Sequence, residues 1–531
     1  MSRVYSRDAQ LHGSAEWASR AYLRSRNYGE KGEIFLGYGL PENNKEGCYP
    51  ITTNTQRHLL TAGSTRSGKL LAASVPRCMD HKGPLVVIDT KDGEITLIVA
   101  KYRRYVLKRK VIVIDSWGKV TNYLGLEPDS FNVLDWLDPN SDDFFEDTML
   151  IAESIVPDQT SSDPFWVDEA RALICGLIMY IAATPTVLIP TDKKSRDLTQ
   201  MRRLLNLSPA NFEEMVGGKF LRDEKGKKIK LIGAGMAQSS NELVRAAASR
   251  ILNKSPREFS GVLSTAQQNT HFLESARIGK SLSSSTFSME DLENGNIDIF
   301  VTLPAGRLFN YHRFLRLLLS IFITAVTRFD TKPNPPVYFV IEEAAALGRL
   351  AIIEKAYALL AGYGAQMHMI TQDFNQLASI YKDNWQSIIA NCGVIQLIGI
   401  MDMFTAEYVS KLCGTTSVEA LSHTSSELRA GLFSSPSYFS AQDNITSRAL
   451  ITPHELVTMH PSAQILILAN SYAVLAYKPI YFLDSRYRDK RGKPLFDIHQ
   501  NYKHLPTPRG IDFTKSGVDV ARILGDIFMG G

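Results

Sequence analysis

Cysteine motifs, a signal peptide and internal repeats are all missing from this sequence. Its five cysteines are odd in number and widely scattered, and no two of them have the CxxC spacing of a zinc or redox motif. This pattern excludes a disulfide framework and indicates reduced thiols in a cytosolic protein. The first residues are polar and contain no apolar segment, which excludes a signal peptide.

Long uncharged apolar runs are nearly missing as well. Residues 172–190 carry no charge, but Thr184, Pro185 and Thr186 interrupt the run. Residues 315–327 are too few to cross a membrane and have arginines at their ends. We therefore expect a buried helix followed by a loop in the first stretch and a core helix in the second. No membrane anchor is predicted within this sequence.

The sequence has no strong excess of charge of either sign. A net charge of +4 on 531 residues is too small to indicate nucleic-acid binding by itself. The basic run at residues 101–110 is typical of a solvated helix face, and a patch for DNA or an acidic partner is the alternative. The length indicates two or more domains, and 44% hydrophobic residues indicate an ordinary soluble globular protein.

A glycine-framed turn joins an apolar strand at 58–62 to a helical segment at 70–79. This strand, turn and helix predict a phosphate-binding P-loop, whose backbone N–H groups converge on an anion while Lys69 reaches the outer phosphates. At position 70 the pattern requires a Ser or Thr hydroxyl for Mg²⁺, but this chain has leucine. The predicted nucleotide-binding residues are Gly63, Ser64, Thr65, Arg66, Ser67, Gly68, Lys69 and Leu70.

Three polar side chains follow two later strands, at 337–341 and 365–371. Hydrolysis of a nucleotide needs an acid for Mg²⁺, a carboxylate that orients water and a polar sensor of the γ-phosphate. We predict Glu342 as the metal residue, and Glu343 and Gln372 as catalytic residues together with Lys69. Taken alone, the two glutamates are equally typical of a surface turn; the P-loop and the glutamine favour the catalytic interpretation.

The order of strands and helices predicts an α/β fold with a parallel-rich sheet. We expect residues 1–150 to form the first part of a nucleotide-binding domain, with the P-loop, and residues 286–531 the second part, with the acids, the glutamine and the last strands. Residues 151–285 show helical patterns and predict an inserted all-α domain, with an exposed hairpin or mobile loop at 220–231. The Ser/Thr-rich residues 417–447 predict a long surface loop or disordered segment.

Together, these motifs resemble those of the type IV secretion coupling proteins, hexameric ATPases that hand relaxase-bound DNA or protein effectors to a conjugation or secretion channel. The similar segments follow the order of the family over most of the chain: 11–17, 65–69, 86–94, 165–171, 342–348, 372–377, 402–407, 414–416 and 448–456.

The resemblance implies a RecA-like P-loop domain with an inserted all-α domain, assembled as a homo-hexamer with ATP between subunits, and ATP and Mg²⁺ as cofactors. The partners that it implies are the channel ATPases and inner-membrane components, and a relaxase with single-stranded DNA or protein effectors. It places the protein in the cytoplasm, at the cytoplasmic face of a bacterial inner membrane. Membrane contact is then made only through partners or through a missing anchor, because the family usually has transmembrane helices before the motif that starts here at His12.

Three positions depart from the family. Leu70 lacks the hydroxyl, Glu342 stands where aspartate is usual, and Ala361 stands where an arginine is frequent. Arg349 and Arg448 are candidates for the missing trans-acting arginine, or are surface arginines. Two functions therefore stay open: an ATPase that delivers DNA–relaxase complexes or effectors, and a degenerate docking platform that binds nucleotide but hydrolyses it weakly or not at all.

Overall fold

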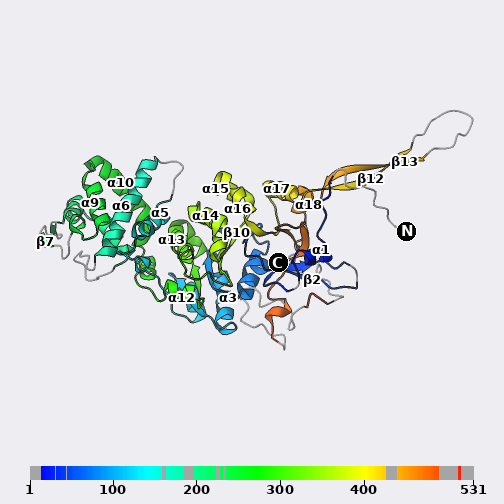
Figure 1. Ribbon diagram of the computed structural model, residues 1–531, viewed down its shortest axis with the longest axis horizontal. Helices are drawn as coiled ribbons and strands as arrows, with labels where there is room; N and C mark the ends of the chain where they lie inside the picture. Colours follow the sequence, from blue (N-terminus) through cyan, green and yellow to red (C-terminus); the bar gives the residue numbers. More distant parts are fainter. Residues whose placement is uncertain are drawn as a thin grey trace, which may run out of the picture.

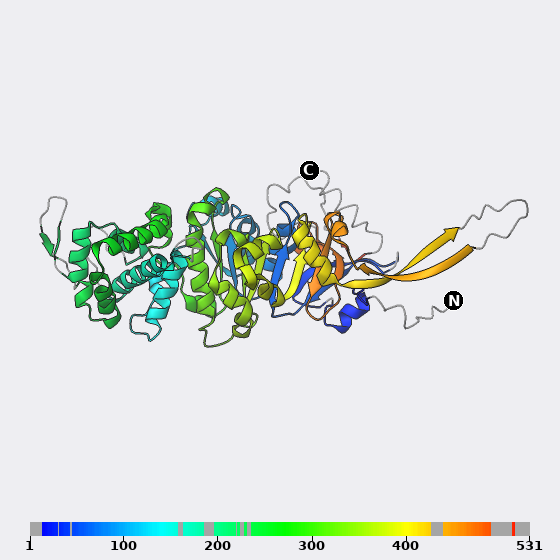
Figure 2. The ribbon, with the colours of Figure 1, turned by 90° about the horizontal axis from the view of Figure 1, so that it is seen from above.

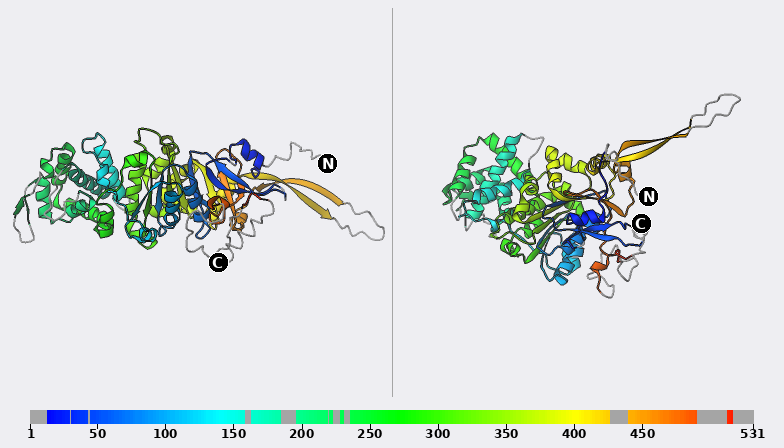
Figure 3. Two further views of the ribbon diagram at one scale, coloured as in Figure 1. Left: turned by 90° about the horizontal axis from the view of Figure 1, so that it is seen from below. Right: turned by 45° about the vertical axis from the view of Figure 1, so that its right-hand side comes forward.

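The computed structural model describes residues 13–489 and 512–515, apart from 30, 43–44, 158–162, 185–195, 219, 223–227, 231–234 and 426–438. In the described part the molecule is elongated, with a helical unit at one end, a large sheet in the middle and a long hairpin at the other end (Figure 1). The same order is visible from the other sides (Figure 3).

The central sheet has 11 strands in the order β2-β1-β15-β14-β11-β3-β10-β9-β4-β8-β5. The run from β11 to β5 is parallel throughout, and β14, β15, β1 and β2 continue it in antiparallel pairs. The parallel strands are β11 (Cys392–Leu397), β3 (His58–Ala62), β10 (Ala365–Thr371), β9 (Val337–Ile341), β4 (Leu85–Asp89), β8 (Ile297–Thr302) and β5 (Lys110–Asp115). The antiparallel strands are β14 (Ala463–Leu468), β15 (Val474–Tyr477), β1 (Ile34–Gly39) and β2 (Tyr49–Thr53).

Both faces of the parallel region are covered, so its strands are continuous apolar runs. Alternate residues of one strand enter different cores: Leu59 packs with α2 (Val75–Asp80) and α3 (Glu94–Tyr105), whereas Leu60 packs with α13 (Leu308–Val326). The second core also contains residues of α14 (Ala351–Leu359), α15 (Phe374–Tyr381) and α16 (Trp385–Ala390). The result is a three-layer arrangement of helices on both sides of a sheet.

The helical unit lies in the chain between β5 and β8, which are neighbours in the sheet. Its main helix, α6 (Pro164–Ala183), is buried along most of its length and packs against α5, α9 and α10. The other helices are α5 (Phe144–Ile155), α7 (Leu198–Leu205), α8 (Pro209–Gly217), α9 (Glu242–Leu252), α10 (Pro256–Thr270) and α11 (Ala276–Ser281). The two short strands β6 (Phe220–Arg222) and β7 (Lys228–Lys230) pair as the hairpin alternative predicts.

No described helix is both long enough and apolar enough to cross a lipid bilayer. The apolar run at 172–190 is helical up to Ala183, and its last residues, 185–190, lie outside the described part of the chain.

Two expectations from the sequence are wrong. Residues 417–447 do not form only a loop: β12 (Thr415–Ser425) and β13 (Phe439–Ala449) pair in register over eleven positions and project from the body as an arm (Figure 2). The segment between them, 426–438, is not described. Threonine is β-branched and favours strands, but the sequence of these two strands has no regular alternation of apolar and polar residues that would reveal them.

The basic run at 101–110 is not one solvated helix face. Helix α3 ends at Tyr105, and Lys110 already begins β5. Arg103 is fully buried and its Nη2 lies 2.7 Å from Asp298 Oδ1, while Arg109 Nε lies 2.9 Å from the same oxygen. The buried carboxylate of Asp298 turns these two arginines inward, because a buried charge requires a partner.

Candidate functional site

Four segments meet at the edge of the sheet where the parallel strands end. They are the loop after β3, Thr90 and Lys91 after β4, the two glutamates after β9, and Gln372 after β10. Because β10 lies between β3 and β9, the glutamine stands between the loop and the acids. Residues that are far apart in the sequence therefore converge on one site, as is general at this edge of open α/β sheets.

The loop after β3 has the close packing and positive dihedral angles of a phosphate-binding turn. Its first glycine is required, because a Cβ on Gly63 would lie 2.1 Å from the carbonyl oxygen of Ile398. Arg66 and Gly68 have φ angles of 63° and 92°, in the left-handed region. The N–H of Ser64 donates to the carbonyl of Gly399 at 3.2 Å, which fixes the loop against the end of β11.

Lys69 is 5% exposed, and its ammonium donates to the carbonyl oxygens of Gly63 and Ser64. Burial lowers the pKa of Lys69 to about 8; Lys91 acts in the same direction, while Glu342 and Glu343 oppose it. The side chain thus lies inside the loop, where burial favours its neutral form.

The two predicted acids lie side by side, and each of their four oxygens has one polar partner. Lys91 Nζ lies 2.8 Å from Glu342 Oε1 and 3.1 Å from Glu343 Oε2. Ser74 Oγ donates to Glu342 Oε2 at 3.4 Å, and Gln372 Nε2 donates to Glu343 Oε1 at 2.9 Å. Glu342 is 2% exposed and Glu343 13%, so the acids form the floor of the site.

The helix that follows the loop begins in an unusual way. Leu70–Ser74 is a single π-helical turn, and α2 continues from Val75. Such turns are rare in proteins, and those that occur are often located at functional sites. Leu70 supplies no hydroxyl, but Ser74, four residues further along, turns its own hydroxyl toward Glu342. The P-loop pattern places a hydroxyl at position 70. Within this turn the only hydroxyl is that of Ser74, about one helical turn further along the chain.

Sequence reasoning missed Lys91, Ser74 and two further residues, Lys478 beside the loop and Asp89 at the end of the strand next to β9. Lys478, after β15, is 2% exposed and its Nζ donates to the carbonyl of Ser67 at 2.6 Å. Asp89, at the end of β4, accepts from the N–H and hydroxyl of Thr96, and burial raises its pKa to about 7. A lysine two residues after a strand-end aspartate was a visible signal for Lys91, whereas Lys478 lies far away in the sequence.

The candidate arginines form local pairs. Arg349 Nε lies 2.7 Å from Glu354 Oε1, and Arg448 forms an ion pair with Glu455. Ala361 lies in a 3₁₀ turn just before β10, at the opposite edge of the sheet from the loop. The structure thus brings together Lys69, both glutamates and the glutamine, but not position 361.

The acid pair fits a hard divalent cation in its donor chemistry. Mg²⁺ is typically held by one or two carboxylates, with waters and substrate phosphates as its other ligands. Glu342 and Glu343 supply such carboxylates, and the described residues contain no larger cluster of His, Cys, Asp and Glu that would hold a metal without a phosphate. The residues present therefore fit Mg²⁺ that arrives with a nucleotide.

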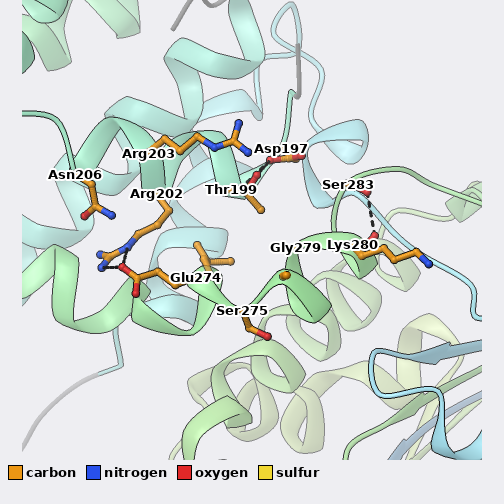
Figure 4. A pocket seen from close by; sticks show the side chains of 12 residues that line it. Asp197, Thr199, Arg202, Arg203, Asn206, Glu274, Ser275, Gly279, Lys280 and Ser283 are labelled. Carbon is orange, nitrogen blue, oxygen red and sulfur yellow. Dashed lines mark hydrogen bonds and ion pairs between the residues drawn. The ribbon is translucent and has the colours of Figure 1, made fainter. Parts of the chain in front are cut away.

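A separate cavity of about 740 Å³ lies in the helical unit, away from the loop and the acids (Figure 4). Arg202, Arg203 and Lys280 line it together with Asp197 and Glu274, so its charges are nearly balanced. Arg202 Nη2 pairs with Glu274 Oε1 at 2.6 Å. None of the site residues predicted from the sequence lines this cavity.

Comparison with known proteins gives a family. The family model "Type IV secretory system Conjugative DNA transfer" matches residues 16–504. The type IV secretion system-coupling protein VirD4 of Bartonella quintana (strain Toulouse) is 26% identical over 460 residues, which are 82% of this chain and 65% of the relative. The conjugal transfer protein TraG of Agrobacterium fabrum is 26% identical over 501 residues, 89% of this chain and 70% of its own. The chain therefore spans about two thirds of the length of these relatives.

Solved structures show the same fold. The bacterial conjugative coupling protein TrwBdeltaN70 in its unbound form aligns with a TM-score of 0.62 at 14% identity, over 87% of this chain and 91% of that one. The plasmid coupling protein TrwB in complex with ADP and Mg²⁺ aligns with a TM-score of 0.60 at 15% identity, over 88% and 94%. The predicted fold class, a RecA-like P-loop domain with an inserted all-α domain, is confirmed.

Proposed function

The chain belongs to the type IV secretory system conjugative DNA transfer family, and from this premise we propose that it is an ATPase coupling protein. In this role it recruits DNA–relaxase complexes, protein effectors or both, and delivers them to a type IV secretion channel. One observation carries the proposal: Lys69, Glu342, Glu343 and Gln372 lie at one edge of the sheet, where Gln372 contacts Glu343 and both glutamates interact electrostatically with Lys69.

Each residue then has a distinct task. Residues Gly63 to Leu70 bind the nucleotide phosphates through backbone N–H groups, and Lys69 adds its ammonium. Glu343 orients the attacking water, and Gln372 holds Glu343 in place and senses the γ-phosphate. Glu342 would hold Mg²⁺, which when bound would neutralise phosphate charge. The TrwB complexes with ADP and Mg²⁺ and with an ATP analogue support ATP and Mg²⁺ as the cofactors.

We extend the proposal to the assembly. Residues 151–285 form the substrate-facing all-α domain, and residues 1–150 and 286–531 form the nucleotide domain of a homo-hexamer. The ring works at the cytoplasmic face of a bacterial inner membrane with channel ATPases and membrane components as partners. The local pairs that Arg349 and Arg448 form favour the interpretation of both as surface arginines.

A phosphate-release assay on the purified protein, with and without single-stranded DNA, tests this function. We expect turnover in the wild type and a loss of about 10²-fold or more in Lys69→Ala and in Glu343→Gln. A wild-type rate no higher than that of Lys69→Ala contradicts the ATPase.

Leu70 is the observation that favours the second candidate function, a docking platform that binds nucleotide without hydrolysing it. Tight nucleotide binding without turnover supports that function. The cargo is tested separately: DNA as cargo requires binding that weakens steeply with added salt, and salt-insensitive behaviour favours protein cargo alone.

A further inference from the structure

We propose that Lys91 is the resident counter-cation of the Glu342–Glu343 pair, and that a divalent metal arriving with the nucleotide must displace its ammonium. Lys91 thereby sets the metal affinity of the site and keeps it low. The inference rests on the proposed nucleotide site and adds a determinant of its metal dependence.

The position of Lys91 carries the first step. The residue follows β4, and its ammonium bridges the two carboxylates at 2.8 and 3.1 Å. Lys91 is 40% exposed, whereas Glu342 is 2% exposed and Glu343 is 13% exposed. The ammonium therefore lies on the solvent side of the acids, which is the side from which a metal–nucleotide complex approaches.

The hydrogen bonds of the carboxylates carry the second step. Oε2 of Glu342 faces Ser74, which is fully buried, and Oε1 of Glu343 faces Gln372. The remaining oxygens, Oε1 of Glu342 and Oε2 of Glu343, are the two that Lys91 holds. Mg²⁺ on Glu342 Oε1, at about 2.0–2.1 Å, would lie within a few ångströms of the Lys91 ammonium, so the two cations would repel each other and compete for this oxygen.

Electrostatics and the side chain at position 70 carry the third step. The ammonium of Lys91 forms ion pairs with both carboxylates, at 2.8 Å to Glu342 and 3.1 Å to Glu343. A metal must therefore compete with a full positive charge. Leu70 has no hydroxyl, so the metal has one protein ligand fewer than in the usual P-loop. This loss lowers the metal affinity of the site further.

The test is a titration of the full chain, saturated with ADP, with Mn²⁺ as a spectroscopic probe, in which electron paramagnetic resonance reports free Mn²⁺. We expect Lys91→Met to bind Mn²⁺ about tenfold more tightly than the wild type, because a competing charge is removed. Lys91→Arg keeps the charge and should stay weak. Lys119→Met is the matched control, since Lys119 pairs at 2.7 Å with Asp92, the residue after Lys91, in an exposed position.

Equal or weaker Mn²⁺ binding by Lys91→Met, with ADP still bound, overturns the inference and leaves the nucleotide site intact. If the wild type itself binds no ADP, the proposed function fails and the inference fails with it. Lys91→Gln, a neutral side chain that keeps hydrogen-bond donors, replaces Lys91→Met if that variant does not fold, and the same tightening is expected from it.

Discussion

At the scale of single residues, the site is defined by the side chains that contact the carboxylate oxygens of Glu342 and Glu343. Sequence motifs predicted Glu342, Glu343 and Gln372, because these directly follow apolar strands, and Lys69, because it ends the glycine-framed turn after β3; the structure places all four at one edge of the sheet. Ser74 was not predictable, because its contact with Glu342 depends on a π-helical turn that has no sequence signature. The chemical roles of the predicted residues stay predictions, and the following two measurements test those of Lys69 and Gln372.

The pH dependence of nucleotide binding should report Lys69. Its pKa is lowered by burial to about 8, so the ammonium that attracts phosphate is present below pH 8 and is lost above it. We expect the Kd of a fluorescent ADP analogue to rise about tenfold per pH unit above pH 8 and to be nearly flat between pH 6.5 and 7.5. Lys69→Met should remove the inflection at pH 8. A wild-type Kd that stays constant up to pH 9.5 contradicts this assignment.

The contact between Gln372 and Glu343 should separate chemistry from binding. Gln372→Ala removes the 2.9 Å hydrogen bond that orients Glu343 but leaves the phosphate loop intact. We expect the ATP turnover rate to fall about 10²-fold while the Kd for ADP changes less than threefold. Steady-state kinetics and a binding titration on the same preparation measure both quantities. A large loss of ADP affinity would instead assign the glutamine to ground-state binding.

At the scale of elements, the strands that are buried on both faces of the sheet were the ones whose bounds could be predicted from the sequence. The bounds of β3, β9 and β10 were predicted correctly because every residue in them is buried and the apolar runs are continuous. The end of α3 and the β12–β13 arm were not predicted. The charges of Arg103 and Arg109 suggested a solvated helix face, but both arginines pair with the buried Asp298. The strands of the arm have no apolar periodicity in the sequence that would indicate their pairing.

The helix after the phosphate loop is fixed to the sheet by one buried arginine. Arg77 of α2 donates to Gln396 Oε1 at 2.5 Å and lies 2.9 Å from His368 Nε2, on β11 and β10. Arg77→Met should lower the free energy of unfolding by about 2–4 kcal/mol, because it leaves buried polar partners unsatisfied. Urea denaturation followed by circular dichroism measures this change. Arg104→Met, at an exposed position of α3, is the control, and an equal effect of the two substitutions would contradict the anchor.

At the scale of the whole molecule, the helical unit and the β12–β13 arm lie at opposite ends of the central sheet (Figure 1). The sequence predicted the insertion of the helical unit, since its helical periodicity interrupts the strand–helix alternation. It could not predict that β5 and β8, on either side of the insertion, become neighbours in the sheet, because their pairing is a long-range contact.

The arm should be dispensable for folding of the body. Its strands pair with each other outside the central sheet, and contacts described at its base include the bridge between Ser14 and Thr416. Replacing residues 419–445 by an Asn-Gly turn closes the ribbon between Val418 and Thr446, which are paired. We expect the Tm to change by less than about 2 °C in differential scanning calorimetry. A Tm lowered by 5 °C or more would show that the arm packs on the body.

The central claim is that the loop at Lys69 and the acids at the sheet edge form one nucleotide site. Isothermal titration calorimetry of the full chain with ADP tests it most directly, with Lys69→Ala as the paired variant. The account predicts one ADP bound per chain and an affinity at least about tenfold lower in Lys69→Ala, since a phosphate loses its charged partner. Equal affinities in the two proteins, or no binding by the wild type, would contradict it.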